Sequence, residues 1–332
     1  MSEIHEHLVD PSPAAARLHE VVDGVFAWVQ PDGSWWINNA GAVSGDDGTI
    51  IVDTCATEER TRRFLDAVRE ATDDAPVRFA ANTHEHGDHT YGNCLLPTEA
   101  ALIGHANMRD RLLVDAVIDS CPPIWEPVPD WGNVTRRVPN IVTHTDLSIF
   151  TGSRRVDLKH PGYAAHTTGD LVAWLPEERV VFTGDLIFHG LTPLVLSGSV
   201  EGALHSVEWL ATFDAEHLVP GHGPLVSGNA ELADVLGDHE RYYRFVMDLA
   251  VAGRNDGISP LHAAQQADLS AFAGWADPER LVLNLHRAYC DLGAEELDIV
   301  AAFLDAITFN GGPLTTHVCC LDANATLDIR EG

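Results

Sequence analysis

The sequence predicts a mixed α/β chain with a helical extension at its C-terminal end. Strand-like runs alternate with helical patterns through the first 230 residues or so, while residues 230–306 carry helical patterns only. Turn sequences such as PDGS and GDDG join several of the strands, and such hairpins do not suit a purely parallel, doubly wound sheet. Of the 332 residues, 45% are hydrophobic, which is enough for a sizeable core.

The first elements follow from alternation, turn signals and helical spacing. Residues 1–20 have the character of a loosely ordered arm. Apolar residues at helical spacing over 57–72 predict an amphipathic helix. Strands are predicted at 25–30, 35–43, 49–53 and 77–82.

A long loop separates the early elements from the later ones. Residues 105–118 are compatible with a helix, and residues 119–140 then contain five prolines and two tryptophans. Long loops inside compact domains are often functional. A further helix is predicted over 201–213. Later strands are predicted at 147–151, 154–160, 171–176, 179–185 and 217–223.

Charge and composition narrow the function classes. The formal charge is −30, from 50 acidic against 20 basic residues, which argues against binding to nucleic acid or anionic membranes. No apolar run is long enough to span a membrane, and the first twenty residues lack the features of a secretory signal. We therefore expect a cytoplasmic protein with reduced thiols, in which Cys319 and Cys320 form either a reactive pair or an ordinary tail.

A cluster of histidines follows one predicted strand. The stretch THEHGDHTYGN contains His84, His86, Asp88 and His89 in an H-x-H-x-D-H pattern. Alternate residues of an extended segment face the same way, so His84 and His86 are expected to reach one metal. The chain then turns at Gly87, which brings Asp88 and His89 near a second position. Imidazole and carboxylate suit Zn²⁺ or Fe²⁺, and a surface cluster without metal is the weaker interpretation.

Three later segments offer more ligands of the same types. His166 lies in the small-residue loop GYAAHTTGD, Asp185 ends the strand VVFTGD, and His222 ends the strand LVPGHG. A single histidine in a loop is more often structural. Together, in this order and beside apolar strands, the three residues indicate a metal centre.

With these motifs, the sequence resembles the metallo-β-lactamase-fold superfamily over residues 20–228. The resemblance implies a four-layer αββα sandwich with metals at the sheet edges, here followed by the helical extension. We expect an arm over 1–20, a catalytic domain over 21–228, a helical extension packed on the core over 229–306 and a tail over 307–332.

The resemblance also implies a complete two-metal site and a hydrolytic mechanism. The metals are usually zinc, with iron and manganese left open. Two metals lower the pKa of a bridging water and polarise a substrate carbonyl. Asp88 is expected to hold or shuttle the proton, and Asp53 to orient ligands, although it is also compatible with a strand-end turn. The first metal is expected on His84, His86 and His166, and the second on Asp88, His89 and His222, with Asp185 between them.

Longer runs are similar to a narrower, actinobacterial subgroup. WWINNAGAVSGDDGTIIVDTCATEERTR and DPERLVLNLHRAY resemble a subgroup that includes cyclases of aromatic (type II) polyketide pathways. This implies aldol ring closure and thioester hydrolysis of an aromatic polyketide carried by an acyl carrier protein. A general thioesterase or lactonase of the same fold is the alternative, and a metal-binding redox or sensor protein is a remote one. Docking of an acidic carrier needs a basic patch, for which the candidates are Arg60, Arg62, Arg63, Arg154 and Arg155.

Candidate substrate contacts lie close to the predicted ligands or in the long loop. Adjacent strand residues face opposite sides of a sheet, so at most one of Trp35 and Trp36 is expected to line the pocket. His189 is a candidate proton shuttle, and the C-terminal helices are expected to cover the sandwich or to form a dimer seam. The remaining candidates are Tyr91 and Asn93 as hydrogen-bond donors to the substrate, and Trp125 and Trp131 as an aromatic lid.

Overall fold

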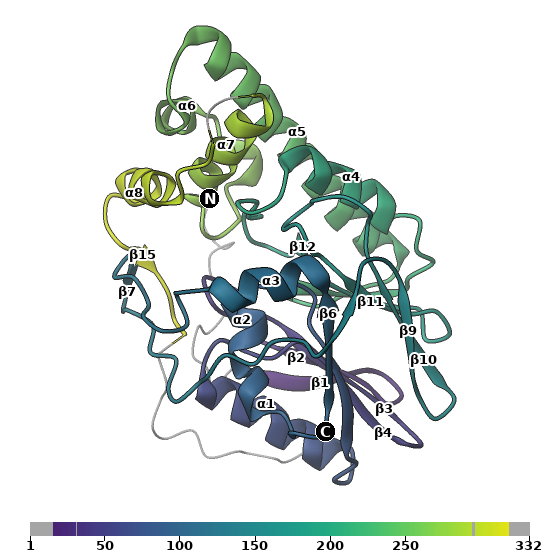
Figure 1. Ribbon diagram of the computed structural model, residues 1–332. Helices are drawn as coiled ribbons and strands as arrows, with labels where there is room; N and C mark the ends of the chain where they lie inside the picture. Colours follow the sequence, from purple (N-terminus) through teal and green to yellow (C-terminus); the bar gives the residue numbers. More distant parts are fainter. Residues whose placement is uncertain (1–15, 31, 294–295, 319–332) are drawn as a thin grey trace, which may run out of the picture.

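Two β-sheets face each other between layers of helices in a computed structural model that describes residues 16–30, 32–293 and 296–318 (Figure 1). The first sheet has seven strands in the order β1-β2-β3-β4-β5-β6-β8, and the second has six in the order β14-β13-β12-β11-β10-β9. Both sheets mix parallel and antiparallel pairs. The predicted αββα sandwich with a C-terminal helical region is confirmed.

Two parallel strands of the first sheet end at the sheet edge where the predicted metal ligands lie. Strands β1 to β4 pair antiparallel, whereas β4, β5, β6 and β8 pair parallel. The chain leaves β4 at Asp53 and β5 just before His84, so both residues lie at the same sheet edge. The strands are β1 (Arg17–Val22), β2 (Val25–Val29), β3 (Ala40–Gly45), β4 (Gly48–Val52), β5 (Val77–Ala81), β6 (Ala101–His105) and β8 (Ile141–Thr143).

The second sheet contributes one parallel pair to the same edge. β12 and β13 run parallel, and Asp185 and His222 lie toward their carboxyl ends. The strands are β9 (Leu147–Thr151), β10 (Arg154–Lys159), β11 (Val172–Leu175), β12 (Val180–Phe188), β13 (His217–His222) and β14 (Val226–Ser227). A separate ladder joins β7 (Trp125–Glu126) to β15 (Leu314–Thr315).

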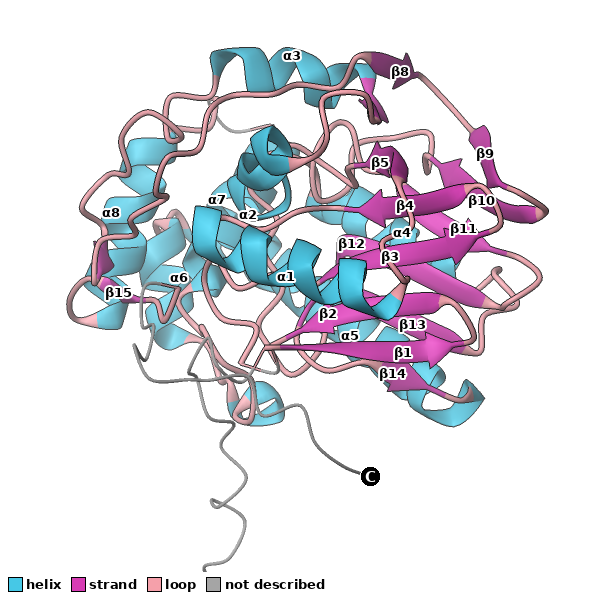
Figure 2. Cartoon of the chain, turned by 90° about the horizontal axis from the view of Figure 1, so that it is seen from below, coloured by secondary structure: helices cyan, strands magenta, loops and turns pink. Residues whose placement is uncertain are grey.

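Helix α1 packs on the outer face of the first sheet, and its sequence accounts for this position (Figure 2). Thr57 caps its first turn by accepting a hydrogen bond from the Arg60 amide, and Phe64 and Val68 are buried on one side. These two residues join Trp28 in the core between the helix and the first sheet. The described helices are α1 (Glu58–Ala71), α2 (Gly87–Thr90), η2 (Tyr91–Leu95), α3 (Ala106–Val114), α4 (Val200–Leu210), α5 (Asn229–Asp256), α6 (Pro260–Gln266), η3 (Ser270–Phe272), α7 (Arg280–Asp291) and α8 (Ile299–Asn310).

The two sheets bury an apolar core between them. Val43 and Ile50 of the first sheet meet Val156 and Phe182 of the second, and all four are almost fully buried. The sheets approach each other closely at Gly41, where a Cβ atom would lie 2.2 Å from the Phe182 ring. Glycine is therefore required at this position for the sheets to pack as they do.

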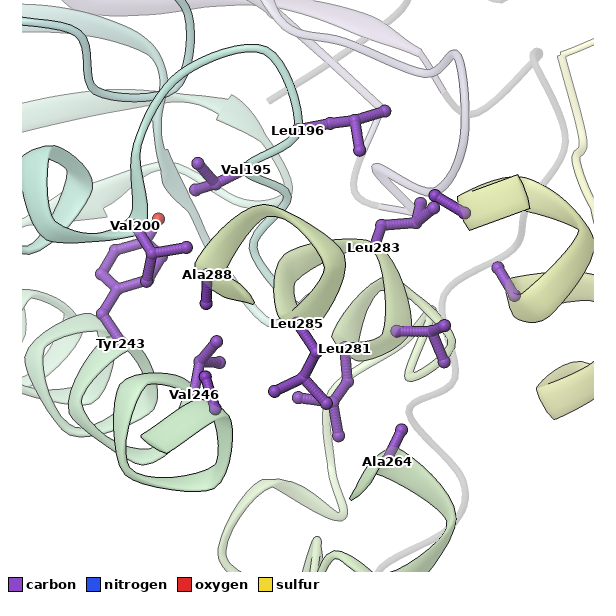
Figure 3. Packing of buried hydrophobic residues seen from close by; sticks show 14 of the residues in the cluster. Val195, Leu196, Val200, Tyr243, Val246, Ala264, Leu281, Leu283, Leu285 and Ala288 are labelled. Carbon is purple, nitrogen blue, oxygen red and sulfur yellow. The ribbon is translucent and has the colours of Figure 1, made fainter. Parts of the chain in front are cut away.

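The helical extension has a hydrophobic core of its own (Figure 3). Leu281 and Leu285 of α7 lie beside Val246 of α5, while Val195 reaches this cluster from the segment after β12. Because that segment leaves the metal-site edge of the second sheet, the cluster ties the extension to the sandwich. Within the described residues, no helix is long and apolar enough to cross a membrane.

Candidate metal centre

Seven histidine and aspartate side chains meet at the edge shared by the two sheets. They come from the segment after β5, from α2, from the β10–β11 loop and from the ends of β12 and β13. Close backbone approach makes this possible: a Cβ on Gly87 would lie 2.2 Å from the Tyr91 ring, and one on Gly221 would overlap the Asp185 carboxylate. The convergence matches the set expected from the sequence: His84, His86, Asp88, His89, His166, Asp185 and His222.

The donor atoms fall into two groups. His84, His86, His166 and Asp185 form the first, and Asp88, His89 and His222 form the second, with the atoms of each group within 4.8 Å of one another. In the first group, His86 Nδ1 lies 3.1 Å from His84 Nε2 and 2.9 Å from His166 Nε2.

Asp185 lies between the two groups. Its Oδ2 is 3.4 Å from His166 Nε2 and 3.4 Å from His222 Nε2, and its Oδ1 is 3.1 Å from His89 Nε2. On the second side, His222 Nε2 also lies 3.2 Å from Asp88 Oδ2. One carboxylate therefore reaches ligands of both groups, as a residue shared by two metals must.

Hydrogen bonds on the outer ring nitrogens orient the imidazoles. Nδ1 of His166 bonds the Leu194 carbonyl at 2.6 Å, and Nδ1 of His222 bonds the Gly33 carbonyl at 2.8 Å. Each bond leaves Nε2 facing the cluster as a ligand atom. His84 and His89 are held in the same way, by Thr83 Oγ1 at 3.0 Å and by Asp53 Oδ2 at 2.8 Å.

The two groups differ in their electrostatics. Burial lowers the pKa of His84 well below its usual value and that of His166 to about 3, so both rings are neutral near neutral pH. Burial also disfavours a charge on His222, but the Asp185 and Asp88 carboxylates raise its pKa to about 9. A metal bound at the second group would therefore have to displace protons.

Two buried atoms that face each other support metal binding at this position. His89 Nε2 and Asp185 Oδ1 lie 3.1 Å apart, but neither forms a hydrogen bond among the described residues, although buried polar atoms normally do. All seven donors are imidazole or carboxylate groups, which suit zinc and also iron or manganese. The residues present therefore fit two divalent metals.

A cavity of about 450 Å³ opens on the cluster at Asp88, Asp185 and His222. Both Trp35 and Trp36 line it, so the expectation that at most one would do so is wrong. The two residues lie in a turn before β3, not on a strand, and Trp36 has a φ of 70°. Strand alternation consequently does not apply to them. Most of the lining is apolar, including Trp125, Phe188, Leu196 and Phe303.

The other predicted residues occupy several positions. Tyr91 lines the cavity, but its hydroxyl donates to Asp115 Oδ2 at 2.8 Å. Trp131 packs behind the wall, with its ring centroid 4.6 Å from that of Trp36. Asn93 is buried in an amide pair with Asn82.

Two predicted roles involve residues that do not line the cavity. His189 is half-buried, and its Nδ1 bonds the Pro224 carbonyl at 3.0 Å. Asp53 lies behind His89 and fixes that ring, as expected of a residue that orients ligands. Cys319 and Cys320 fall outside the described residues.

Four charged residues of the cavity wall are not identified from the sequence. They are Glu85, Arg111, Asp115 and Arg280 of α7. Arg280 is buried, forms an ion pair with Asp277 at 2.7 Å and lies 4.5 Å from the centroid of the Trp35 ring. In the sequence, Arg280 has no feature that separates it from other arginines of amphipathic helices.

Comparison with known proteins agrees with this geometry. Residues 33–222 match the family model of the metallo-beta-lactamase superfamily. The chain is 24% identical over 212 residues to the 2,4-dinitroanisole O-demethylase subunit alpha of a Nocardioides species, covering 63% of this chain and 56% of that one. It is 22% identical over 262 residues to a linear primary-alkylsulfatase of a Pseudomonas species, covering 68% and 49%.

A solved structure shows the same fold. The stereoselective inverting sec-alkylsulfatase Pisa1 from a Pseudomonas species aligns with a TM-score of 0.66 at 17% identity, covering 88% of this chain and 54% of that one. The chain thus spans about half the length of the relatives it matches here. These relatives support the superfamily and not the polyketide-cyclase subgroup.

The chain belongs to the metallo-β-lactamase superfamily. Within the described residues, its histidine and aspartate side chains form two groups that could hold metal ions.

Proposed function

We propose that the protein is a two-zinc hydrolase and cyclase that acts on a hydrophobic acyl thioester, with an aromatic polyketide intermediate as the substrate class. The observation that carries this proposal is the cavity. It joins a metal cluster to a wall of tryptophan, phenylalanine and leucine side chains within about 450 Å³. Such a site favours a flat or elongated apolar group with one polar reacting end.

The ligand set defines what the centre would do. His84, His86 and His166 would hold one zinc and Asp88, His89 and His222 the other, with Asp185 between them. Two bound metals supply a hydroxide nucleophile near neutral pH and polarise the carbonyl under attack.

The protein's own groups position the reaction and move its proton. Although burial alone would raise the pKa of Asp88, the neighbouring His89 and His222 lower it to about 2, so Asp88 is a carboxylate near neutral pH. Asp88 can then accept a proton from water in hydrolysis, or from the substrate methylene in ring closure. Phe188 and Trp36 line the cavity, and the Phe188 ring stacks on His222 with ring centroids 5.0 Å apart, which places an apolar group beside the ligands.

In this proposal, an acyl carrier protein delivers the substrate, and it must dock on the protein surface near the cavity. Among the arginines considered for a basic patch, Arg62 and Arg63 pair with Glu58 and Glu59 on α1. Arg60 is buried. Arg154 and Arg155 pair with Glu178 and Asp157. Because each of these four partly or fully exposed arginines already has an acidic partner, the carrier protein must dock on a surface that does not depend on them.

Alkyl sulfate hydrolysis is the second candidate. Two of the similar proteins are named alkylsulfatases. In this chain, Arg111 and Arg280 line the same cavity as the metal ligands and could balance an anionic ester. An alkyl sulfate also combines an apolar chain with one polar reacting end.

Two substrates with apolar chains of equal length distinguish the two candidate functions. Zinc-loaded protein would be given decanoyl-N-acetylcysteamine and decyl sulfate, with and without a chelator. Faster, chelator-sensitive release of thiol than of sulfate supports the proposal, and the reverse order supports the second candidate. His86→Ala should abolish turnover, whereas His205→Ala, at an exposed position on α4, should not. Equal turnover by wild type and His86→Ala would refute both.

A further inference from the structure

Helix α8 presents exposed apolar side chains at the mouth of the cavity. Ile299, Val300 and Leu304 are 46%, 70% and 57% exposed, yet with Phe303 they line the cavity that reaches the metal cluster. Residues four apart are neighbours on a helix surface, so Ile299 and Phe303 form one row and Val300 and Leu304 the next. The two rows make one apolar face that is partly inside the cavity and partly in solvent.

This face belongs to a helix that is held in place. Ala302 and Ala306 are fully buried in the core of the extension. Asp305 pairs with His286 Nε2 of α7 at 2.8 Å, and Asp298 caps the helix by accepting a bond from the Ala301 amide. The exposed apolar face is therefore a fixed feature of the surface and not a frayed end.

The face is continuous with the aromatic wall above the metals. The Phe303 ring centroid lies 5.7 Å from that of Trp125 and 6.2 Å from that of Trp35. No charged residue interrupts the helix between Ile299 and Leu304, in a chain with a formal charge of −30. An apolar path therefore runs from the cavity wall to the outer surface of α8.

We propose that the apolar part of the substrate leaves the cavity across Val300 and Leu304, so that α8 selects substrates with long or multi-ring hydrophobic groups. The inference deepens the proposed function and rests on it for the reaction at the polar end. A short acyl group would be held within the aromatic wall and would not reach Val300 and Leu304. A long one would cover side chains that are otherwise exposed, and its binding would gain the hydrophobic contribution of that contact.

The test compares two matched double variants. Val300→Thr with Leu304→Gln makes the face polar at exposed positions, where folding should not suffer. Val251→Thr with Leu292→Gln makes the same changes at 45% and 41% exposed positions of α5 and the end of α7, outside the cavity lining. Binding of butanoyl- and dodecanoyl-N-acetylcysteamine is measured by quenching of tryptophan fluorescence in metal-free protein, and KM is measured in zinc-loaded protein.

We expect the α8 variant to bind the dodecanoyl thioester about five-fold more weakly, with butanoyl binding changed by less than about two-fold. The control variant should match wild type for both. Equal losses for the two thioesters, or no loss for either, would overturn the proposal. The proposal would also be overturned if light scattering showed that the wild-type protein is a dimer and the α8 variant is a monomer. A second copy of the chain would then cover the apolar face of α8. If length-dependent binding persists while no thioester is hydrolysed, the proposed function fails and the inference about α8 stands.

Discussion

Replacing Asp53 with asparagine should weaken metal binding without disturbing the backbone. Asp53 is buried, and its carboxylate accepts three hydrogen bonds: from the Thr83 amide at 2.7 Å, from Thr83 Oγ1 at 2.7 Å and from His89 Nδ1 at 2.8 Å. Its φ is +60°, a left-handed conformation that asparagine adopts more readily than most residues. Asp53→Asn therefore changes the charge and hydrogen-bonding pattern while keeping the shape.

The size of the effect follows from these three bonds. An amide has one acceptor oxygen and one NH₂ donor, so it cannot accept from both the Thr83 amide and the His89 ring in this arrangement. If the NH₂ faces His89, the ring must carry its proton on Nε2, the atom that faces the cluster. Loss of such an orienting carboxylate typically lowers metal affinity 10- to 100-fold. An unsatisfied buried group would also destabilise the protein by about 1–3 kcal/mol.

Metal affinity is measured by competition with a chromophoric chelator, and stability by urea unfolding of the metal-free protein. Asp157→Asn is a suitable control because Asp157 is also a buried aspartate, but it lies in β10 and accepts hydrogen bonds from Ser148 and Arg155. We expect weaker zinc binding in Asp53→Asn only. Wild-type zinc affinity in that variant would refute the assigned role of Asp53 in orienting His89.

Three further variants test the packing and electrostatics of the fold. Gly41→Ala should destabilise the protein by about 1–3 kcal/mol in urea unfolding, because the new methyl group meets the Phe182 ring; unchanged stability would contradict the tight sheet contact. Tyr91→Phe should cost about 1 kcal/mol through loss of the bond to Asp115 while zinc content stays the same, and a loss of zinc would instead place Tyr91 at the centre. Burial lowers the pKa of His239 from 6.5 to about 4, so the unfolded chain binds more protons in this range and metal-free protein should lose about 3 kcal/mol as pH falls through it. His239→Gln should remove this part of the pH dependence, and an unchanged slope in urea unfolding would contradict the assignment.

The metal ligands could be predicted because their signal is local. His84, His86, Asp88 and His89 lie within six residues, and Asp185 and His222 each lie toward the carboxyl end of an apolar strand. Parallel strands bring their carboxyl ends to one sheet edge, so Asp185 and His222 are expected to meet there. The structure brings them together with the other five predicted ligands.

Other parts of the site depend on tertiary contacts that a local pattern does not encode. Arg280 and Phe303 reach the cavity from helices far along the chain and have ordinary helical surroundings in the sequence. The sequence after the PDGS turn predicts a strand that includes Trp35 and Trp36, but the chain turns there, with a positive φ at Trp36. Here the packing of the tryptophans against the loop overrides the local preference.

Two short strands of the first sheet are not predicted from the sequence. β1 begins at Arg17, within the segment expected to be an arm, and three of its six residues are exposed while the other three are partly buried. β6 spans only Ala101–His105, and the helix expected from 105 begins directly after it as α3. Such short strands are stabilised by pairing with neighbours, which a window of five residues does not reveal.

The stoichiometry of bound metal tests the central claim most directly. Protein loaded with zinc and freed of excess metal would be analysed by elemental analysis, for wild type and for His86→Ala. Two zinc per chain in wild type, with less than two in the variant, is the result that a centre built from the seven ligands predicts. Retention of no zinc by wild type, or equal zinc in both proteins, would contradict it.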